Sequence, residues 1–210
     1  PVILINMTGS AMDLRFAEES FSAVVQGWYP GARGGKAIAE LLFGKYSFSG
    51  KLPVTFYNDS DELPAFTDYA MENRTYRYFT GGVLYPFGYG LSYTTFAVSD
   101  VVLDQNEMDK NGRIAAKVTV KNTGDAAGCE VVQLYIRDDY SDVVRPVKEL
   151  KGFRKVELAP GEEQEVTFYI TEEDLRYYRL DGTFGSEPGT FTVMIGNSST
   201  TENSAVFTLK

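Results

Sequence analysis

The sequence predicts an α/β region followed by an all-β region, and three observations lead to this prediction. Short apolar runs alternate with helix-forming stretches near the N-terminus, which is typical of a parallel sheet with crossover helices. From residue 98 onward, apolar and polar residues alternate in segments separated by turn residues, which is typical of an immunoglobulin-like β-sandwich. A stretch rich in Tyr, Phe, Gly and Pro lies between them. We therefore expect a partial α/β domain over residues 1–60, an aromatic connecting loop over 61–97 and a β-sandwich over 98–210.

The composition argues against several classes of protein. Of the 210 residues, 43% are hydrophobic, which favours a packed core over disorder. The net charge of −9 argues against a nucleic-acid partner, which needs a basic surface. No apolar run approaches the ~18–20 residues of a membrane-spanning helix, so we expect no membrane partner. One cysteine and no histidine leave no internal disulfide and no Ser-His, Cys-His or His-metal site within the chain.

The first elements follow a strand–helix–strand–helix order. Val2–Ile5 is a short, β-branched apolar run that predicts a buried parallel strand, and Ala23–Gln26 predicts a second one. A short helix is expected around Leu14–Phe21. Lys36–Phe43 predicts a helix because it contains good helix formers with one apolar face, and Gly44 is its expected C-terminal cap. This order implies a parallel sheet with right-handed crossovers.

Two strands and two helices do not complete such a domain, because parallel sheets occur almost only with both faces covered. The chain also opens within its first strand, at Pro1. We therefore expect that the missing strands lie upstream of residue 1 or in another chain. These first residues carry no information on the cellular compartment.

The aromatic stretch shows little periodicity. Leu52–Phe56 could form a short strand, with Pro53 favouring a sheet edge. Thr75–Phe79 alternates as a strand does, and Tyr85–Tyr93 predicts a glycine-punctuated loop. An irregular segment of this length usually carries function or wraps a neighbouring surface. The favoured interpretation of its aromatic residues is that they are packing anchors between domains.

About seven strands are expected in the sandwich. Five are marked by alternating apolar residues, and two more are expected near 98–104 and 147–158. Cys129 lies just before a strand and has no partner cysteine, so it does not form an immunoglobulin disulfide. The alternating sets are Ile114/Ala116/Val118/Val120, Val132/Leu134/Ile136, Val166/Phe168/Ile170, Phe191/Val193/Ile195 and Ala205/Phe207/Leu209.

Paired carboxylates were considered because glycosidases use two of them. For each acidic group we favour a solvated surface position, and Thr171 is expected to cap a helix whose first turn carries acids. Calcium binding at Asp138, Asp139 and Asp142 is conceivable, but their spacing matches no known calcium loop. Gly31–Gly35 lacks the dinucleotide and P-loop patterns. The acidic groups are Glu18/Glu19, Asp59/Asp61/Glu62, Asp138/Asp139/Asp142 and Glu172/Glu173/Asp174.

Trp28, Arg74 and Tyr76 are the candidate substrate-binding residues. Trp28, the only tryptophan, follows the second predicted strand, at the sheet edge where α/β ligand sites form. A sugar could stack on it, although we favour a packing role between the two regions. Arg74, Tyr76 and Arg77 could line a polar pocket of the aromatic loop, whereas packing and a salt bridge are favoured for Arg77.

Several long motifs of the chain resemble the C-terminal part of family 3 glycoside hydrolases, the β-glucosidase and β-xylosidase group. The resemblance covers essentially the whole chain, and the second region is similar to the fibronectin type III-like domain of that family. The motifs that carry it are Gln26–Gly31, Gly34–Ala39, Leu42–Gly44, Ser49–Phe56, Tyr85–Thr94, Val120–Gly124 and Lys148–Phe153.

The resemblance implies a longer enzyme with a (β/α)8 barrel, a six-stranded α/β sandwich domain and the fibronectin-like domain. Such enzymes are retaining exo-glycosidases that act on terminal, non-reducing β-linked sugars. Their nucleophilic Asp lies on the barrel and their acid/base is usually a Glu upstream of the motifs found here, so no catalytic residue is assigned to this chain. No cofactor or metal is implied. The expected partners are the remainder of the enzyme and a β-linked oligosaccharide or glycoside.

Two alternatives remain open. Asn73–Phe79 is more similar to the β-xylosidase branch, which modestly favours xylose over glucose. The second alternative is a stand-alone carbohydrate-binding or adhesion module built on the sandwich, without catalysis. Such a module would fold and bind sugar through residues 98–210 alone.

Overall fold

A computed structural model describes the backbone of residues 1–210 and every side chain except that of Ser60. The chain forms two compact units, unit 1 from Pro1 to Leu91 and unit 2 from Ser92 to Lys210. Unit 1 is mixed α/β and unit 2 is all-β apart from one 3₁₀ helix, as the sequence predicts.

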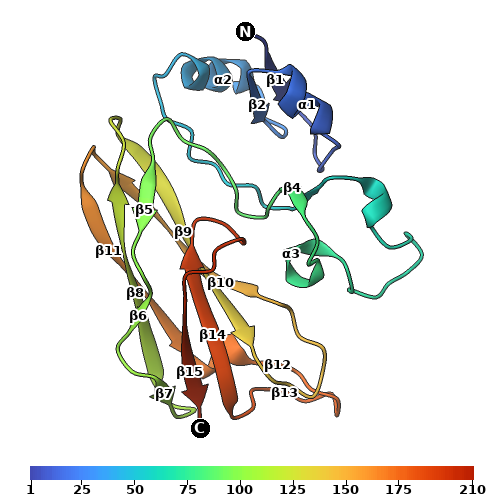
Figure 1. Ribbon diagram of the computed structural model, residues 1–210, viewed down its shortest axis with the longest axis vertical. Coiled ribbons are helices and arrows are strands. Elements are labelled where there is room, and N and C mark those ends of the chain that lie inside the picture. Colours follow the sequence, from blue (N-terminus) through green and yellow to red (C-terminus); the bar gives the residue numbers. More distant parts are fainter. The chain divides into compact units, whose positions relative to one another are not determined.

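Unit 1 begins with a strand–helix–strand–helix order (Figure 1). Strands β1 (Ile3–Asn6) and β2 (Ala23–Gln26) pair in parallel, with Ile3 opposite Ala23. Helix α1 (Arg15–Ser20) lies between them in the chain, and α2 (Gly34–Leu42) follows β2. These four predicted elements are confirmed to within two residues at each end.

Helix α2 ends as expected at Gly44, which has a φ of +73°. The N–H of Gly44 donates to the carbonyl of Leu41, and the N–H of Lys45 donates to that of Glu40. These two bonds satisfy carbonyls that the end of a helix otherwise leaves unpaired. Glycine is favoured there because the left-handed conformation has no steric cost for it.

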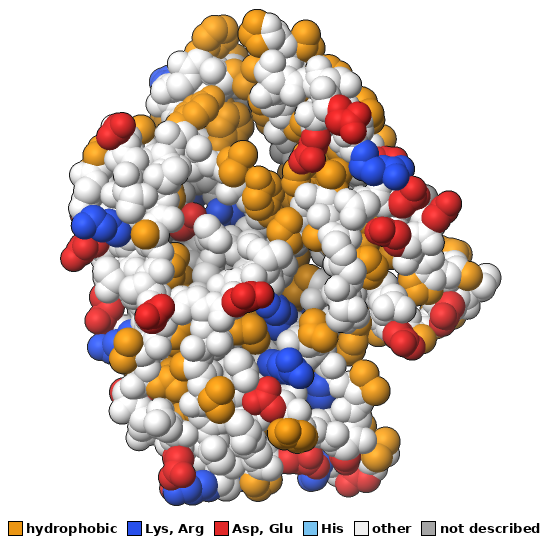
Figure 2. All heavy atoms as spheres, viewed as in Figure 1, with side chains coloured by type: hydrophobic (Ala, Val, Ile, Leu, Met, Phe, Trp, Pro, Cys, Tyr) orange, Lys and Arg blue, Asp and Glu red, His pale blue; other side chains and the backbone are white. Residues whose placement is uncertain are grey.

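Strand β1 is less buried than its apolar sequence predicts. Val2 is 62% exposed and Ile3 is 42% exposed. Within the part of the chain that the structure describes, β1 and β2 form a two-stranded sheet. Figure 2 shows hydrophobic side chains gathered on the surface over β1, α1 and α2. Within unit 1 itself β1 is therefore not buried, because none of the described residues of this unit covers the outer part of the sheet.

The remainder of unit 1 contains four short elements: β3 (Phe56–Tyr57), η1 (Ser60–Glu62), α3 (Thr75–Tyr78) and β4 (Val83–Tyr85). Strands β3 and β4 pair in antiparallel fashion. The predicted strand at Leu52–Phe56 reaches the β conformation only at Phe56. Leu52 instead exchanges backbone hydrogen bonds with the loop at Gly88 and Tyr89, both at 2.8 Å.

The prediction of a strand at Thr75–Phe79 is wrong, because this segment forms the one-turn helix α3. Asn73 and Thr75 both have a φ of +56°, which turns the chain away from an extended path. The N–H of Thr75 donates to the hydroxyl of Tyr57 at 2.7 Å, and the N–H of Phe79 donates to the carbonyl of Thr75. These contacts come from tertiary structure, so the alternation of residue types could not reveal them.

Unit 2 is a sandwich of two sheets (Figure 1). One sheet has the strand order β10-β9-β14-β15-β7, and the other has the order β11-β8-β5 with β6 also paired to β8. The strands are β5 (Phe96–Val98), β6 (Val102–Leu103), β7 (Glu107–Met108), β8 (Arg113–Asn122), β9 (Gly128–Asp138), β10 (Glu149–Leu158), β11 (Glu163–Thr171), β14 (Gly189–Gly196) and β15 (Ser204–Leu209).

Six of the seven predicted strands are continuous, whereas the one expected near 98–104 is split into β5 and β6. The short strands β12 (Tyr177–Tyr178) and β13 (Phe184–Gly185) form an additional hairpin. Thr171 precedes the 3₁₀ helix η2 (Glu172–Leu175), and the carboxylate of Asp174 accepts from its N–H at 2.8 Å. The helix start predicted at Thr171 is thus confirmed.

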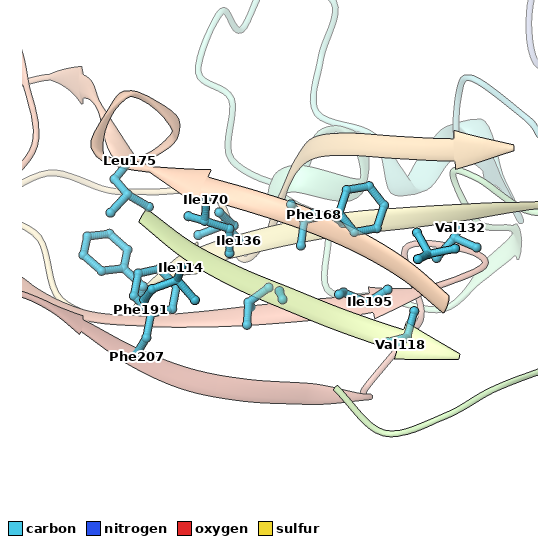
Figure 3. Packing of buried hydrophobic residues seen from close by; sticks show 14 of the residues in the cluster. Ile114, Val118, Val132, Ile136, Phe168, Ile170, Leu175, Phe191, Ile195 and Phe207 are labelled. Carbon is cyan, nitrogen blue, oxygen red and sulfur yellow. The ribbon is translucent and has the colours of Figure 1, made fainter. Parts of the chain in front are cut away.

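The core of unit 2 lies between the two sheets. Figure 3 shows side chains of β8 and β11 pointing toward those of β9, β14 and β15. Phe191 and Phe207 stack with ring centroids 5.5 Å apart. All five sets of alternating apolar residues contribute to this core, as predicted.

Candidate functional site

Trp28 belongs to the small apolar core of unit 1. It packs edge-to-face on Phe56, with ring centroids 6.4 Å apart, and has a φ of +50°. Phe56 also contacts Tyr85 at 6.0 Å, and Tyr85 stacks on Tyr89 at 5.7 Å. Burial raises the pKa of Tyr85 to about 12, with a further contribution from its hydrogen bond to Glu18. Trp28 therefore lies at one end of a row of packed aromatic rings.

Arg74 holds a loop together through its guanidinium. Its terminal nitrogen donates to the carbonyls of Ala65 at 3.0 Å and Asp68 at 2.7 Å, and Nε donates to that of Ala70 at 3.1 Å. Because a guanidinium offers five donors in a fixed plane, one side chain can satisfy several carbonyls of an irregular segment. The hydrogen bonds of Arg74 thus hold the backbone of residues 65–74 in place.

Tyr76 stacks on Phe87, with ring centroids 4.2 Å apart and an interplanar angle of 19°. This contact ties α3 to the loop that follows β4. Arg77 lies in the same helix and is half-buried. The role of Trp28, Arg74 and Tyr76 in substrate binding stays a prediction.

Asp13 and Asp59 in unit 1 are unsuited to acid catalysis. Arg15 contacts Asp13 at 2.6 Å and Asp59 at 2.9 Å. Hydrogen bonds from Arg15 lower the pKa of Asp13 to about 2. The pKa of Asp59 is also lowered, mainly by the hydrogen bond that it accepts from the N–H of Asp61. A glycosidase acid needs the opposite shift, toward a raised pKa.

In unit 2, two carboxylates that were expected on a solvated surface are buried. Glu172 accepts hydrogen bonds from Arg176 at 2.7 Å and from the hydroxyl of Ser186 at 2.6 Å, and its pKa is lowered mainly by Arg176. Asp138 has a side chain that is only 6% exposed, and burial raises its pKa. The expectation of a solvated position is therefore wrong for both, because each has a neighbouring arginine that allows burial.

The three aspartates considered for calcium have separate partners. Asp138 faces Arg145 at 3.7 Å, Asp139 accepts from the hydroxyl of Thr192, and Asp142 accepts from that of Tyr177 at 3.0 Å. No three Cys, Asp or Glu side chains among the described residues gather in a way that could hold a metal ion.

A cavity of about 320 Å³ opens at the turn between β9 and β10, and we call it the β9–β10 cavity. Arg145 lies at this cavity with its guanidinium 4.2 Å from the ring centroid of Tyr177. Sequence analysis missed the cavity, although the polar run from Asp138 to Ser141 was its signal. The lining residues are Arg137, Asp138, Asp139, Tyr140, Ser141, Val143, Arg145, Pro146 and Val147.

No helix in the described part of the chain is long and apolar enough to cross a bilayer.

The two units match two different domain families. Residues 1–93 match the glycosyl hydrolase family 3 C-terminal domain, and residues 130–199 match the fibronectin type III-like domain. The chain is 41% identical over 208 residues to a periplasmic β-glucosidase of Salmonella typhimurium, and 42% identical over 200 residues to a xylan 1,4-β-xylosidase of Xylanibacter ruminicola.

These alignments cover 93% and 94% of this chain but only 27% and 23% of the two relatives. Among solved structures, a mutant β-glucosidase of Listeria innocua in complex with laminaribiose is similar to the whole chain. The TM-score is 0.87 and the sequence identity is 32%. The chain covers 31% of that structure. A β-glucosidase of Erythrobacter marinus gives a TM-score of 0.87 at 37% identity.

Proposed function

Because this chain belongs to the family 3 glycoside hydrolases and corresponds to their C-terminal part, we propose that it serves a retaining, exo-acting β-glycosidase. The substrate would be a terminal, non-reducing β-linked glucose or xylose of an oligosaccharide or glycoside. The observation that carries the proposal is the continuous similarity across both units to enzymes with these activities. Identities of 41% and 42% do not favour one sugar over the other.

The proposed role of this part is structural support for an active site built elsewhere in the enzyme. A retaining glycosidase needs two carboxyl groups about 5–5.5 Å apart, one of them with a raised pKa. In unit 1 the paired carboxylates Asp13 and Asp59 have lowered pKa values and share Arg15. They are therefore suited to an ion pair, and the catalytic carboxylates are proposed to lie outside these residues.

The partner of unit 1 is proposed to be the rest of the same enzyme. The apolar side chains of Val2, Ile3 and Phe43 are 62%, 42% and 91% exposed. Two parallel strands need covering layers on both faces, and the relatives are several times longer than this chain. Further strands and helices of the enzyme would bury this surface.

The proposal is tested with 4-nitrophenyl β-glucoside and 4-nitrophenyl β-xyloside. The intact protein that carries this chain is expected to hydrolyse at least one of them with retention of configuration at the anomeric carbon. The 210 residues produced alone are expected to be inactive. Hydrolysis by these residues alone, above a mock-purified control, would show that the catalytic carboxylates lie within them and would contradict the proposal.

The non-catalytic alternative gives a different result in the same experiment. A stand-alone binding module would leave both glycosides intact in every form of the protein. The match of residues 1–93 to a glycosidase domain favours the enzyme.

A further inference from the structure

We propose that the β9–β10 cavity is a carbohydrate-binding site and that its ligand is a segment of a neutral β-linked oligosaccharide. The site is built within unit 2 from the end of β9 and the turn that follows it. The β-linkage of the ligand rests on the function proposed above, whereas binding at this site requires no hydrolysis.

The size of the cavity suits one sugar residue of a longer chain. Its volume of about 320 Å³ lies at the lower end of the roughly 300–1,000 Å³ typical of ligand sites. A large cofactor would not be enclosed. An oligosaccharide could place one residue in the cavity and continue on either side, because the cavity is open to solvent.

The charges of the lining favour a neutral ligand. Arg137 and Arg145 contribute two positive charges, and Asp138 and Asp139 contribute two negative charges. A phosphate or carboxylate would be repelled by both aspartates, and a cation would be repelled by both arginines. Sugar hydroxyls avoid this conflict because each is both a donor and an acceptor of hydrogen bonds.

The buried ion pair of the cavity is incompletely satisfied. Arg145 has an 18% exposed side chain, and its Nε is buried without a hydrogen-bond acceptor among the described residues. The nearest carboxylate oxygen, on Asp138, lies 3.7 Å from this Nε, beyond the range of a good hydrogen bond. Buried polar groups normally have partners. Neighbouring hydroxyls of a sugar would accept from Arg145 and donate to Asp138 after a rotation of the Arg145 side chain that opens its Nε to the cavity.

Tyr140 supplies the apolar part of the site. It lines the cavity, yet it is 83% exposed. A tyrosine combines a large apolar ring with a polar hydroxyl and is ordered at low cost in conformational entropy. The C–H face of a pyranose ring is a matching apolar surface. Stacking on Tyr140 would hold the sugar residue that lies above the ion pair.

The test compares the intact protein with two variants in native gels that contain soluble xylan or hydroxyethyl cellulose. Tyr140→Ala removes the stacking ring. Tyr169→Ala is the matched control, because Tyr169 is a 57% exposed tyrosine on β11 that does not line the cavity. Retardation at increasing polymer concentration gives the dissociation constant of each form.

We expect at least one polymer to retard the parent protein. Tyr140→Ala should raise the dissociation constant about tenfold, which corresponds to about 1.4 kcal/mol, and Tyr169→Ala should change it less than twofold. An active site that binds chain ends would retard the parent and Tyr140→Ala equally. Hydrolysis of the 4-nitrophenyl glycosides should be the same in all three forms, because Tyr140 is outside the proposed catalytic machinery.

Three outcomes would overturn the proposal: no retardation of the parent, equal retardation of the parent and Tyr140→Ala, or stronger retardation by polygalacturonate than by either neutral polymer. The last would show that the ligand is acidic. If the parent protein hydrolyses neither 4-nitrophenyl glycoside, only the proposed catalytic function is contradicted. The difference in polymer binding between Tyr140→Ala and Tyr169→Ala does not depend on hydrolysis.

Discussion

Unit 1 and unit 2 differ in how much apolar surface each covers with its own residues. The core of unit 2 contains nineteen buried residues between two sheets. The core of unit 1 contains three, Leu14, Ala17 and Phe56, with half-buried residues packed around them. Both units contain apolar strands, so composition alone does not separate them. What separates them is closure: the sandwich has two facing sheets, whereas a two-stranded parallel sheet leaves its apolar faces open.

The strongest test of this comparison is to separate the units. Residues 92–210 produced alone should unfold in one cooperative transition with dispersed amide signals in NMR spectra, because their core is complete. Residues 1–91 produced alone should lack such a transition and bind a hydrophobic dye. Urea unfolding followed by circular dichroism distinguishes the two results. A cooperative transition in residues 1–91 would mean that unit 1 does not need the covering layers proposed for it.

A core truncation in unit 2 should have the next largest effect. Ile195 is fully buried between the sheets, and Ile195→Ala should lower the free energy of unfolding by about 3 kcal/mol, the usual cost of emptying such a site. Val206 lies on β15 of the same sheet but is 53% exposed. Val206→Ala is the control and should cost less than about 1 kcal/mol. Equal losses in the two variants would contradict the position assigned to this core.

The two units also differ in their ion pairs. Glu172 in unit 2 is buried with Arg176 and Ser186, whereas Arg15 in unit 1 joins the exposed Asp13 and the half-buried Asp59. Glu172→Gln should lower the free energy of unfolding by about 2 kcal/mol at pH 7, because it replaces charge-assisted hydrogen bonds in a buried site. Arg15→Gln should cause no measurable change, since exposed pairs contribute little.

The effect of Glu172→Gln should depend on pH. Because the pKa of Glu172 is lowered from 4.5 in the folded protein, its carboxylate stabilises the fold fully above pH 4.5. This stabilisation is lost as the pH falls through the folded pKa. The difference between parent and variant should therefore be largest at neutral pH and shrink in acid. A difference that grows as the pH falls would mean that the pKa of Glu172 is raised.

The sequence predicted unit 2 better than unit 1, for a physical reason. In a half-buried strand the pattern of apolar residues directly records which face is covered, so Val118, Phe168 and Ile195 mark the core. In the aromatic part of unit 1, the conformation depends on contacts between distant residues. The helix at Thr75 needs the hydroxyl of Tyr57 as an acceptor, and Arg74 needs the carbonyls of a loop that had no predicted structure.

The candidate site shows the same limit. Trp28, Arg74 and Tyr76 could be selected by residue type, but the ring contacts of Trp28 and Tyr76 lie within unit 1, and packing between the domains stays a prediction. The polar run from Asp138 to Ser141 indicates only a polar turn at the β9–β10 cavity, because the burial of Asp138 and Arg145 depends on Tyr177, which lies more than thirty residues later in the chain.

The smallest predicted effect concerns the end of α2 in unit 1, where local sequence determines the structure. Gly44→Ala should lower the free energy of unfolding of the intact protein by about 1 kcal/mol, because the φ of +73° there disfavours a residue with a Cβ. Gly35→Ala is the matched control. Gly35 lies within α2, with nothing within 4 Å of an added Cβ, so alanine should stabilise the helix by several tenths of a kcal/mol. Thermal unfolding should therefore shift in opposite directions in the two variants. Shifts of the same sign would show that the end of α2 also depends on tertiary contacts, which would extend the contrast with unit 2 to every element of unit 1.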